Sequence, residues 1–549
     1  MVNTHKILMN QYKKYYNHFI ENSYNVEEIQ TKKLLEILRK NKRSEFGQKH
    51  SFSSIKTIEQ FQRNIPTETY EGYKKYINKI SLKRQAVLTS EKITLFEPTS
   101  GSTSNSKLIP YTDGLRTEFL AGIAPWIYSI HKNYPQAMIG KQYWSITPIV
   151  NSEKPNFKSG IKIGFEDDGF YLGTDNERNN NMFIVPIEIK YVFDFRSFKY
   201  LTHLFLLKEK SLSLISIWNP SMMQVLFEDI KADMLSLCKD IAKGTFNDSL
   251  IIPKNIKLKL LRQFSADKKR AEELLNIYEK YKDTSIFFHK IFPNLKIISC
   301  WTNGNARLSM DFIKNNFSKS IVQGKGLIAT ECIVSIPINK LKFPAVSILS
   351  HFFEFLELDE DLSPTGKILL THQLELNKQY CVIVTTSGGL YRYNLNDIIS
   401  VKGYFNQIPL IEFIGKLDNV SDIVGEKLHE TYVKNSIVKI LKKYDLKPKF
   451  IMLAPEKENN NIFYVMFIES KTHDTLKLEI EKELSKNYHY SYCRKIGQLK
   501  PLKVFIIKSN GARDYIKHKA SMIKLGDIKL SYLSKEFGWS QVFEGSYSR

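Results

Sequence analysis

A short stretch of small polar residues carries the first candidate chemistry in this chain of 549 residues. It runs from Glu97 to Lys107, and apolar residues lie directly before and after it. This order predicts a strand, a tight loop and a second strand. A loop that turns at glycine and offers backbone N–H groups, hydroxyls and one ammonium suits an anionic ligand, above all a polyphosphate. A solvated serine/threonine linker is the alternative that such a composition usually indicates. The candidate phosphate-binding residues are Thr99, Ser100, Gly101, Ser102, Thr103, Ser104 and Lys107.

Four further clusters follow along the chain. A buried-strand pattern at residues 295–301 leads into Asn303, Gly304 and Asn305, a turn of small residues where backbone can approach a flat ligand. Residues 326–331 read as a strand that ends on Thr330 and Glu331. A tyrosine-rich segment then runs from Tyr391 to Asp397, and a Gly-Lys-x-Asp sequence follows at residues 415–418. Taken singly, each cluster is weak evidence for a binding site. A carboxylate after a strand, for example, is more often a cap or an ion-pair partner than a ligand-binding group.

The elements that must position these clusters follow from hydrophobic periodicity. Helices are predicted over residues 26–45, 70–80 and 113–131, with Thr67 as a candidate N-cap before the second, and strands over 143–146, 295–301 and 410–414. After residue 420 we expect a helix at 430–443, paired strands at 450–454 and 462–468, and a helix at 476–484. This pattern predicts an α/β protein with a smaller α+β domain of about 130 residues at its C-terminal end.

Composition excludes several classes of protein. The formal charge of +23 could indicate nucleic-acid binding, but the lysines are spread along the whole chain, as on a solvated surface. Specific nucleic-acid or membrane binding is therefore not expected. The chain shows no apolar run of membrane-spanning length and no signal-peptide core at its start. Its five cysteines are widely separated, which fits a reducing cytoplasm better than a disulfide framework.

Four of these clusters occur in the order found in the adenylate-forming enzymes, which make acyl-AMP from a carboxylate and ATP, and the chain resembles them in this. The four are the loop that ends in Lys107, the Thr330–Glu331 pair, the segment from Tyr391 to Asp397 and the Gly-Lys-x-Asp sequence at 415–418. Within that superfamily the chain is most similar to the Gretchen Hagen 3-type acyl acid amido synthetases, the auxin-conjugating enzymes and their bacterial relatives. The resemblance covers essentially the whole chain. Besides the clusters it includes the segments 143–148, 164–168, 389–393 and 424–428, together with Trp301.

The resemblance implies a role for each cluster. Residues 99–107 would form the ATP phosphate loop, and Thr330 and Glu331 would lie beside the phosphates, with Glu331 holding Mg²⁺. Asn303, Gly304 and Asn305 would flank adenine, and Asp397 would bind the ribose hydroxyls. Tyr391 and Tyr393 would border the nucleotide, although packing is the expected role for at least one of them. Lys416 would add a charge near the ribose or phosphates, and Lys529 would be the catalytic lysine of the C-terminal domain.

Four departures from the family pattern stand out. Ser104 and Asn396 replace glycines. Lys416 replaces an arginine, so it keeps a positive charge but cannot make the paired hydrogen bonds of a guanidinium group. Asparagine tolerates a left-handed backbone, so the turn at Asn396 can persist. The tail lacks the glutamine, proline and arginine that surround the family's lysine, which leaves Lys517, Lys519 and Lys524 as alternatives to Lys529.

The implied fold is a large N-terminal adenylate-forming domain over residues 1–415, with β-sheets flanked by helices. A hinge at 416–420 would join it to a small mobile α+β domain at 421–549. The implied reaction is adenylation of a carboxylic acid by ATP with Mg²⁺, then transfer of the acyl group to an amino acid or another amine. We expect a cytoplasmic monomer. The alternatives are an acyl-CoA ligase or adenylate-only enzyme, a degenerate nucleotide-binding protein without activity, and a basic nucleic-acid-binding protein.

Overall fold

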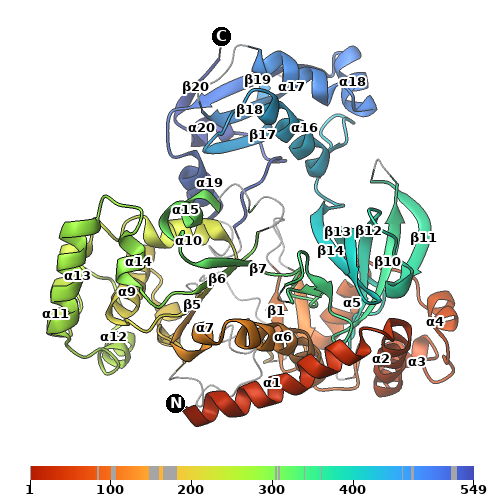
Figure 1. Ribbon diagram of the computed structural model, residues 1–549. Helices are drawn as coiled ribbons and strands as arrows, with labels where there is room; N and C mark the ends of the chain where they lie inside the picture. Colours follow the sequence, from red (N-terminus) through yellow and green to blue (C-terminus); the bar gives the residue numbers. More distant parts are fainter. Residues whose placement is uncertain are drawn as a thin grey trace. The chain divides into compact units, whose positions relative to one another are not determined.

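The computed structural model describes residues 2–82, 86–99, 107–146, 160–164, 182–302, 306, 310–338, 340–359, 362–459, 461–470, 475–520 and 528–548 (Figure 1). The chain divides into two compact units by its contacts. The first comprises Met1–Thr302, Asp311–Leu395 and Ile399–Phe413, and the second Asn303–Met310, Asn396–Ile398 and Ile414–Arg549. Each unit has a hydrophobic core of its own.

Five helices open the chain, and their apolar residues recur at helical spacing. They are α1 (Val2–Asn22), α2 (Val26–Asn41), α3 (Glu45–Lys49), α4 (Ile58–Asn64) and α5 (Tyr70–Ser81). Helix α2 buries Leu34, Ile37 and Leu38 on one face, which confirms the helix predicted from residue 26. Helix α5 confirms the helix predicted at 70–80, but its N-cap is Thr69 and not Thr67.

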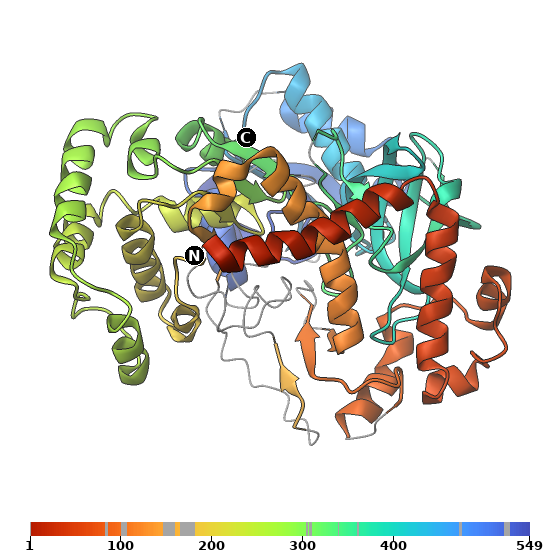
Figure 2. The same ribbon diagram turned by 60° about the horizontal axis from the view of Figure 1, so that its bottom comes forward.

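The predicted strand, loop and strand around residue 100 are confirmed at both strands. Strand β1 (Leu95–Pro98) pairs antiparallel with β2 (Leu108–Tyr111) and parallel with β4 (Lys162–Ile163). Strand β2 leads into α6 (Asp113–Asn133), whose N-cap Thr112 accepts a hydrogen bond from Leu115 N–H at 3.1 Å. Helix α6 is largely buried, and α1 lies alongside it in both views (Figures 1 and 2).

A four-stranded parallel sheet follows in the order β3-β5-β6-β7. Its strands are β3 (Gln142–Trp144), β5 (Leu214–Ser216), β6 (Ile297–Cys300) and β7 (Ile321–Gly324). Parallel neighbours need crossover connections, and helices occupy the segments between these strands. The helical segments of this region are α7 (Pro135–Ile139), η2 (Ile187–Tyr191), α9 (Phe195–Lys208), α10 (Pro220–Phe227), α11 (Met234–Lys243), α12 (Lys254–Leu261), α13 (Lys268–Tyr281), α14 (Phe287–Ile291) and α15 (Met310–Asn316).

A seven-stranded sheet has the order β11-β10-β12-β13-β14-β9-β8. Helix α2 is fastened to it, because Gln30 Nε2 donates to the carbonyls of Ile348 and His351 at 2.7 and 2.8 Å. Its strands and one short helix are β8 (Ser335–Ile336), β9 (Ala345–Val346), β10 (Phe352–Leu358), β11 (Pro364–Leu370), η4 (Thr371–Gln373), β12 (Gln379–Thr385), β13 (Tyr393–Phe405) and β14 (Ile408–Lys416).

The second unit is built on a four-stranded sheet in the order β17-β18-β19-β20. The predicted strand pair at 450–454 and 462–468 and the helices at 430–443 and 476–484 are confirmed. The buried Glu426 accepts from the N–H groups of Ile423 and Val424 and from the Tyr464 hydroxyl, which fixes the turn before α16. The elements are β15 (Val420–Ser421), β16 (Leu428–His429), α16 (Glu430–Lys443), β17 (Phe450–Glu458), β18 (Asn461–Glu469), α17 (Leu476–Leu484), α18 (Tyr488–Lys495), β19 (Leu499–Ile507), α19 (Gly511–Ala520), α20 (Trp539–Val542) and β20 (Gly545–Tyr547).

The predicted fold class is confirmed: helices and sheets are mixed in the first unit, and a smaller sheet with flanking helices forms the second. All five cysteines are buried and free. Among the described residues, no helix combines the length and the apolar character that crossing a membrane requires.

Candidate functional site

The base of the predicted phosphate loop is a closed β-hairpin. Thr99 N–H donates to the Lys107 carbonyl at 2.8 Å, one step beyond the paired Pro98 and Leu108. The loop itself, with Ser100, Gly101, Ser102, Thr103 and Ser104, lies outside the described residues. The Thr99 hydroxyl is buried at its base and has no hydrogen-bond partner within the described part of the chain. A buried hydroxyl normally has a partner, so this one remains available to a ligand.

Tyr70 of α5 holds the far side of this hairpin. Its hydroxyl accepts a hydrogen bond from Leu108 N–H at 2.8 Å, and burial raises the pKa of the phenol. The phenol therefore stays neutral at physiological pH. Because Leu108 directly follows Lys107, this bond fixes the backbone from which the predicted ammonium extends.

The Thr330–Glu331 segment is a turn and not the end of a strand. The strand predicted at 326–331 is wrong: the sheet strand is the earlier β7, and Ile328 and Ile333 form only an isolated bridge. Ala329 N–H donates to the Cys332 carbonyl at 2.9 Å and closes the turn. The apolar residues at 327–329 indicated a strand, but here they pack a buried turn.

Two tyrosines hold this turn in place. The Tyr111 hydroxyl donates to the Thr330 carbonyl, and the Tyr393 hydroxyl donates to Glu331 Oε1 at 3.3 Å. Tyr111 ends β2, the strand that begins one residue after Lys107. Strand β2 therefore connects two of the predicted clusters: Lys107 directly precedes the strand, and Tyr111 at its other end bonds to the Thr330–Glu331 turn. We call β2, this turn and the two tyrosines the framework around Glu331. Tyr393 also connects Glu331 to the start of β13.

A buried histidine supports the turn from the core. Ile333 N–H donates to His351 Nε2 at 3.2 Å, so His351 carries its proton on Nδ1, which lies 3.0 Å from Glu118 Oε2. Glu118 also accepts from Ser387 N–H at 3.0 Å. Burial lowers the pKa of His351, which keeps the ring neutral and Nε2 an acceptor.

Glu331 fits the predicted magnesium ligand in type and in setting. Its residue is 8% exposed, and one carboxylate oxygen is oriented by Tyr393. Within the described residues no group of three His, Cys, Asp or Glu side chains forms a metal cage. Mg²⁺ commonly takes one or two carboxylates and completes its coordination with water and phosphate oxygens, so a single carboxylate is an adequate protein ligand.

Tyr391 lies in the core and presents no ring surface to a nucleotide. It is 0% exposed, its ring stacks on Phe46 at 4.8 Å between centroids, and its hydroxyl donates to the Leu88 carbonyl at 2.7 Å. Burial raises its pKa well above the usual range. The side chain packs the first unit, so the predicted nucleotide contact through Tyr391 is wrong in this structure. Packing was the other role expected for one of the two tyrosines.

Asp397 and Lys416 form an ion pair within the second unit. Lys416 Nζ lies 2.8 Å from Asp397 Oδ1, and the Asp397 side chain is 5% exposed. Asn396 has φ +59°, so the left-handed turn expected at this position is present. Its carbonyl accepts from Leu417 N–H at 2.7 Å, and its side chain donates to Asp418 at 3.2 Å. The predicted ribose-binding cluster is thus a connected group around one oriented carboxylate.

The tail lysines differ sharply in their surroundings. Lys529 is exposed, and its carbonyl accepts from the Tyr515 hydroxyl at 3.2 Å. Lys519 is buried, lies 2.6 Å from Glu536 and faces the ring of Trp539. Lys517 is exposed, and Lys524 lies outside the described residues. Lys519 is therefore a structural lysine, whereas the side chain of Lys529, like that of Lys517, is exposed.

The predicted adenine segment is the least defined. Asn303, Gly304 and Asn305 lie outside the described residues. Trp301, just before them, packs edge-on against Phe413 at 5.3 Å between centroids.

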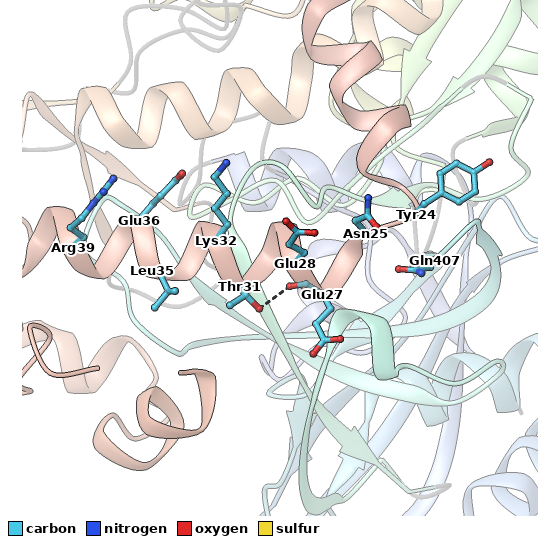
Figure 3. Close-up of a pocket in the computed structure, with 10 residues that line it drawn as sticks. All are labelled: Tyr24, Asn25, Glu27, Glu28, Thr31, Lys32, Leu35, Glu36, Arg39 and Gln407. Carbon is cyan, nitrogen blue, oxygen red and sulfur yellow. Dashed lines mark hydrogen bonds between the residues drawn. The ribbon is translucent and has the colours of Figure 1, made fainter. Parts of the chain in front are cut away.

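A surface hollow of about 840 Å³ lies elsewhere, along α2 (Figure 3). Figure 3 shows Lys32 and Glu36 pointing to one side of the helix and Leu35 and Glu27 to the other, so no group of side chains converges on one point. None of the predicted site residues lines it. The lining residues are Tyr24, Asn25, Glu27, Glu28, Thr31, Lys32, Leu35, Glu36, Arg39 and Gln407.

Sequence patterns alone did not identify the residues that support the site. Tyr70, Tyr111, Glu118 and His351 are single residues outside every motif, and the bond from Tyr111 to Thr330 joins positions 219 residues apart. No local periodicity signals such a contact. An alignment in which these four residues vary less than their neighbours is the signal that would identify them.

Comparison with known proteins agrees with this framework. Residues 15–322 match the GH3 family N-terminal domain, and residues 345–416 match the GH3 family central domain. The indole-3-acetic acid-amido synthetase GH3.2 of Arabidopsis thaliana is 24% identical over 481 residues, which are 83% of this chain and 84% of that protein. The jasmonoyl-L-amino acid synthetase JAR4 of Nicotiana attenuata is 22% identical over 405 residues, covering 70% of this chain and 68% of that protein.

A solved structure shares the fold. The GH3.15 acyl acid amido synthetase superposes with a TM-score of 0.80 at 18% identity and covers 97% of this chain and 96% of its own. The first domain match alone spans more than half of the chain. The resemblance inferred from the residue clusters is confirmed, and the chain belongs to the GH3 family.

Proposed function

We propose that this protein is an ATP-dependent amide ligase, which adenylates a carboxylic acid and transfers the acyl group to an amino acid or another amine. The observation that carries the proposal is the framework around Glu331. Tyr111 and Tyr393 hold the Thr330–Glu331 turn on the same unit as the hairpin that ends in Lys107. Family membership supports it, because the named relatives are amido synthetases of indole-3-acetic acid and of jasmonic acid.

The first step activates the acid. A carboxylate oxygen attacks the α-phosphorus of ATP, the bond to the bridging oxygen breaks, and pyrophosphate leaves. Negative charge grows on the phosphoryl oxygens, and the Lys107 ammonium and the loop N–H groups stabilise it. Glu331 would hold Mg²⁺, which neutralises phosphate charge when it is bound. Exposed Lys529 is the proposed second ammonium at the reacting phosphate.

Asp397 and Lys416 are proposed to bind the nucleoside. An ionised carboxylate accepts two hydrogen bonds and so fits a pair of ribose hydroxyls. Lys416, already 2.8 Å away, would share its charge between Asp397 and the nucleotide. The backbone bond from Leu417 N–H to the Asn396 carbonyl joins the strands β13 and β14, which carry the two side chains. Orientation before binding lowers the entropic cost of the complex.

The second step forms the amide. The amine nitrogen attacks the acyl carbonyl, the bond from that carbon to the phosphate oxygen breaks, AMP leaves, and the nitrogen loses a proton. The acyl adenylate is already a strong electrophile, so no serine or cysteine nucleophile is required. The fully buried cysteines agree with this assignment.

The test measures pyrophosphate and AMP release over a panel of carboxylic acids and amines, with mass spectrometry of the products. An amide that appears together with AMP supports the proposal. A thioester formed when coenzyme A replaces the amine would instead establish an acyl-CoA ligase. If no acid releases pyrophosphate and ATP does not bind, the protein is not an amide ligase.

A further inference from the structure

One carboxylate of the second unit, that of Glu430, joins two segments that carry predicted site residues. Glu430 is half-buried in the first turn of α16. Its Oε2 accepts a hydrogen bond from the Asn419 side chain, and its N–H donates to the Asn419 carbonyl at 2.9 Å. Its Oε1 accepts from the Ser531 hydroxyl and from Tyr532 N–H, the latter at 2.9 Å. All four residues belong to the same compact unit.

The first segment is the turn that follows Lys416. The Asp418 carboxylate accepts from the Asn396 side chain at 3.2 Å, and the Asp418 carbonyl accepts from Lys535 Nζ at 2.8 Å. Because Asn396 directly precedes Asp397, the turn lies beside the ion pair that Asp397 and Lys416 form. This turn therefore connects the proposed ribose-binding pair to the C-terminal tail.

The second segment is the part of the tail that carries Lys529. Ile528 and Leu530 are each 3% exposed, so the backbone on both sides of Lys529 is anchored in the core, whereas Lys529 itself is exposed. The Tyr515 hydroxyl of α19 donates to the Lys529 carbonyl at 3.2 Å. The core and α19 therefore hold this backbone from one side.

Strand β17 and Glu430 hold the same segment after Leu530. Leu453 N–H of β17 donates to the Tyr532 carbonyl at 2.8 Å, and Ser534 N–H donates to the Leu453 carbonyl at 2.8 Å. Glu430 binds Ser531 and Tyr532, which are two and three residues after Lys529. Bonds to an ionised carboxylate are stronger than those between neutral groups. Glu430 thus fixes the tail close to Lys529.

Loss of Glu430 would displace the tail and not the ribose-binding pair. The pair has bonds of its own, because Lys416 binds Asp397 and Leu417 N–H donates to the Asn396 carbonyl. The backbone position of Lys529 sets the region that its ammonium can reach. A shift of about 1 Å caused by a residue away from the reaction lowers rates up to about 100-fold.

We propose that Glu430 is a positioning residue for adenylation, which holds the segment carrying Lys529 in a fixed place relative to Asp397 and Lys416. This inference rests on the proposed ligase function. A carboxylate in the first turn of a helix also stabilises the helix through its charge. That role depends on the negative charge, whereas positioning depends on an oxygen that accepts from Ser531 and Tyr532, so the two roles respond differently to an amide.

The test measures pyrophosphate release at varied ATP concentration, so that kcat and KM are obtained separately. Glu430→Ala should lower kcat about 10-fold and leave KM for ATP unchanged. Glu430→Gln should keep most of kcat, because its amide oxygen still accepts from the tail although the charge is lost. Ser531→Ala, a milder change to the same contact, should lower kcat several-fold. Thermal unfolding of each variant establishes that the altered protein is folded.

A double variant shows whether Glu430 acts through Lys529. In the background of Lys529→Met, Glu430→Ala should cause no further loss of kcat, because two residues that act as one unit have non-additive effects. The matched control is Glu481→Ala, which removes another half-buried carboxylate of the same unit, one that accepts from Leu502 N–H at 2.6 Å and pairs with Arg494. It should leave kcat unchanged.

Three results would overturn the inference. They are a natural kcat in Glu430→Ala, a loss of kcat that is equal in Glu430→Gln and Glu430→Ala, and full additivity with Lys529→Met. The second of these is the result that a helix-dipole role predicts.

Hydrogen exchange separates this inference from the ligase function. Glu430 protects Tyr532 N–H, so a peptide that contains Tyr532 should exchange faster in Glu430→Ala. If exchange is faster but no acid releases pyrophosphate in the natural protein, the ligase function fails and the contact that fixes the tail stands. If the natural protein releases pyrophosphate and Glu430→Ala changes neither kcat nor exchange, the ligase function stands and the inference fails.

Discussion

The ammonium of Lys416 lies 2.8 Å from the carboxylate of Asp397, although Lys416 is half exposed and Asp397 is almost completely buried. An exposed ion pair contributes little to stability, but a buried carboxylate that loses its partner is costly. The pair therefore holds one oriented anion at the surface of the second unit. In the proposed function, that anion binds the ribose.

The first prediction concerns this pair. Lys416→Met should raise KM for ATP by about 10-fold, because Asp397 loses the charge that orients it. Asp397→Asn should raise KM further, and Lys416→Arg should match the natural protein. Pyrophosphate release at varied ATP concentration measures these values. Lys402→Met, which removes a lysine 4.0 Å from Glu412 on the strands β13 and β14, is the control. An unchanged KM in Lys416→Met would contradict the assignment.

The second prediction concerns Glu331 and the tyrosine that orients it. Tyr393→Phe removes the 3.3 Å hydrogen bond but keeps the ring, so it should lower apparent Mg²⁺ affinity by about 10-fold, as loss of a supporting bond does at metal sites. Glu331→Gln should have a larger effect on the same quantity. Activity at varied Mg²⁺ and fixed ATP measures both. If both variants need the same Mg²⁺ concentration as the natural protein, Glu331 does not hold the metal.

The third prediction concerns pH and the buried histidines. Burial lowers the pKa of His203 to about 4 and lowers that of His351, whereas the unfolded chain keeps the ordinary value of 6.5. Below pH 6.5 the unfolded state therefore binds more protons, and stability falls as the pH drops toward the folded values. His203 alone should cost about 1 kcal/mol between pH 6.5 and 5.5.

Urea unfolding at pH 7.5, 6.5 and 5.5 checks this dependence. His203→Gln should flatten the slope between pH 6.5 and 5.5, and His351→Gln should do the same while offering an amide oxygen to Ile333 N–H. His18→Gln, at an exposed position on α1, controls for the substitution itself. Identical slopes in the natural protein and in His203→Gln would refute the expectation.

The fourth prediction separates the tail lysines. Lys529→Met should lower the rate of pyrophosphate release about 10-fold or more without changing unfolding, because Lys529 is exposed. Lys519→Met should chiefly destabilise the second unit, because it leaves Glu536 without the ion partner 2.6 Å away and removes a cation from the face of Trp539. If Lys529→Met is fully active, Lys529 is not the catalytic lysine and another lysine has that role.

Particular residues show what could be predicted from the sequence. The strands on either side of residue 100, the helix at 430–443 and the left-handed turn at Asn396 follow from local chemistry, namely apolar runs, periodicity and a tolerant residue type. The order of the clusters along the chain was sufficient to predict the family. These features need no knowledge of distant contacts.

The supporting contacts could not be predicted in this way. Tyr111 meets Thr330, and His351 meets both Ile333 and Glu118, only after the strands and α6 have packed together. The apolar run at 327–329 was predicted to be a strand because buried strands are apolar. A buried turn selects apolar residues equally, so the sequence pattern does not distinguish the two. Tyr391 was predicted to border the nucleotide because it belongs to the Tyr391–Asp397 motif. Membership of a motif does not distinguish a tyrosine that contacts a ligand from one that only packs the core.

The most direct test of the central claim follows oxygen atoms through the reaction. The acid is one with which the enzyme releases pyrophosphate from ATP, and both of its carboxylate oxygens are labelled with ¹⁸O. It is incubated with the enzyme, ATP and the amine, and the masses of the products are measured by mass spectrometry. An acyl adenylate predicts one ¹⁸O in the phosphate of AMP and one in the amide. Unlabelled AMP, or ¹⁸O in inorganic phosphate released together with ADP, would contradict the account.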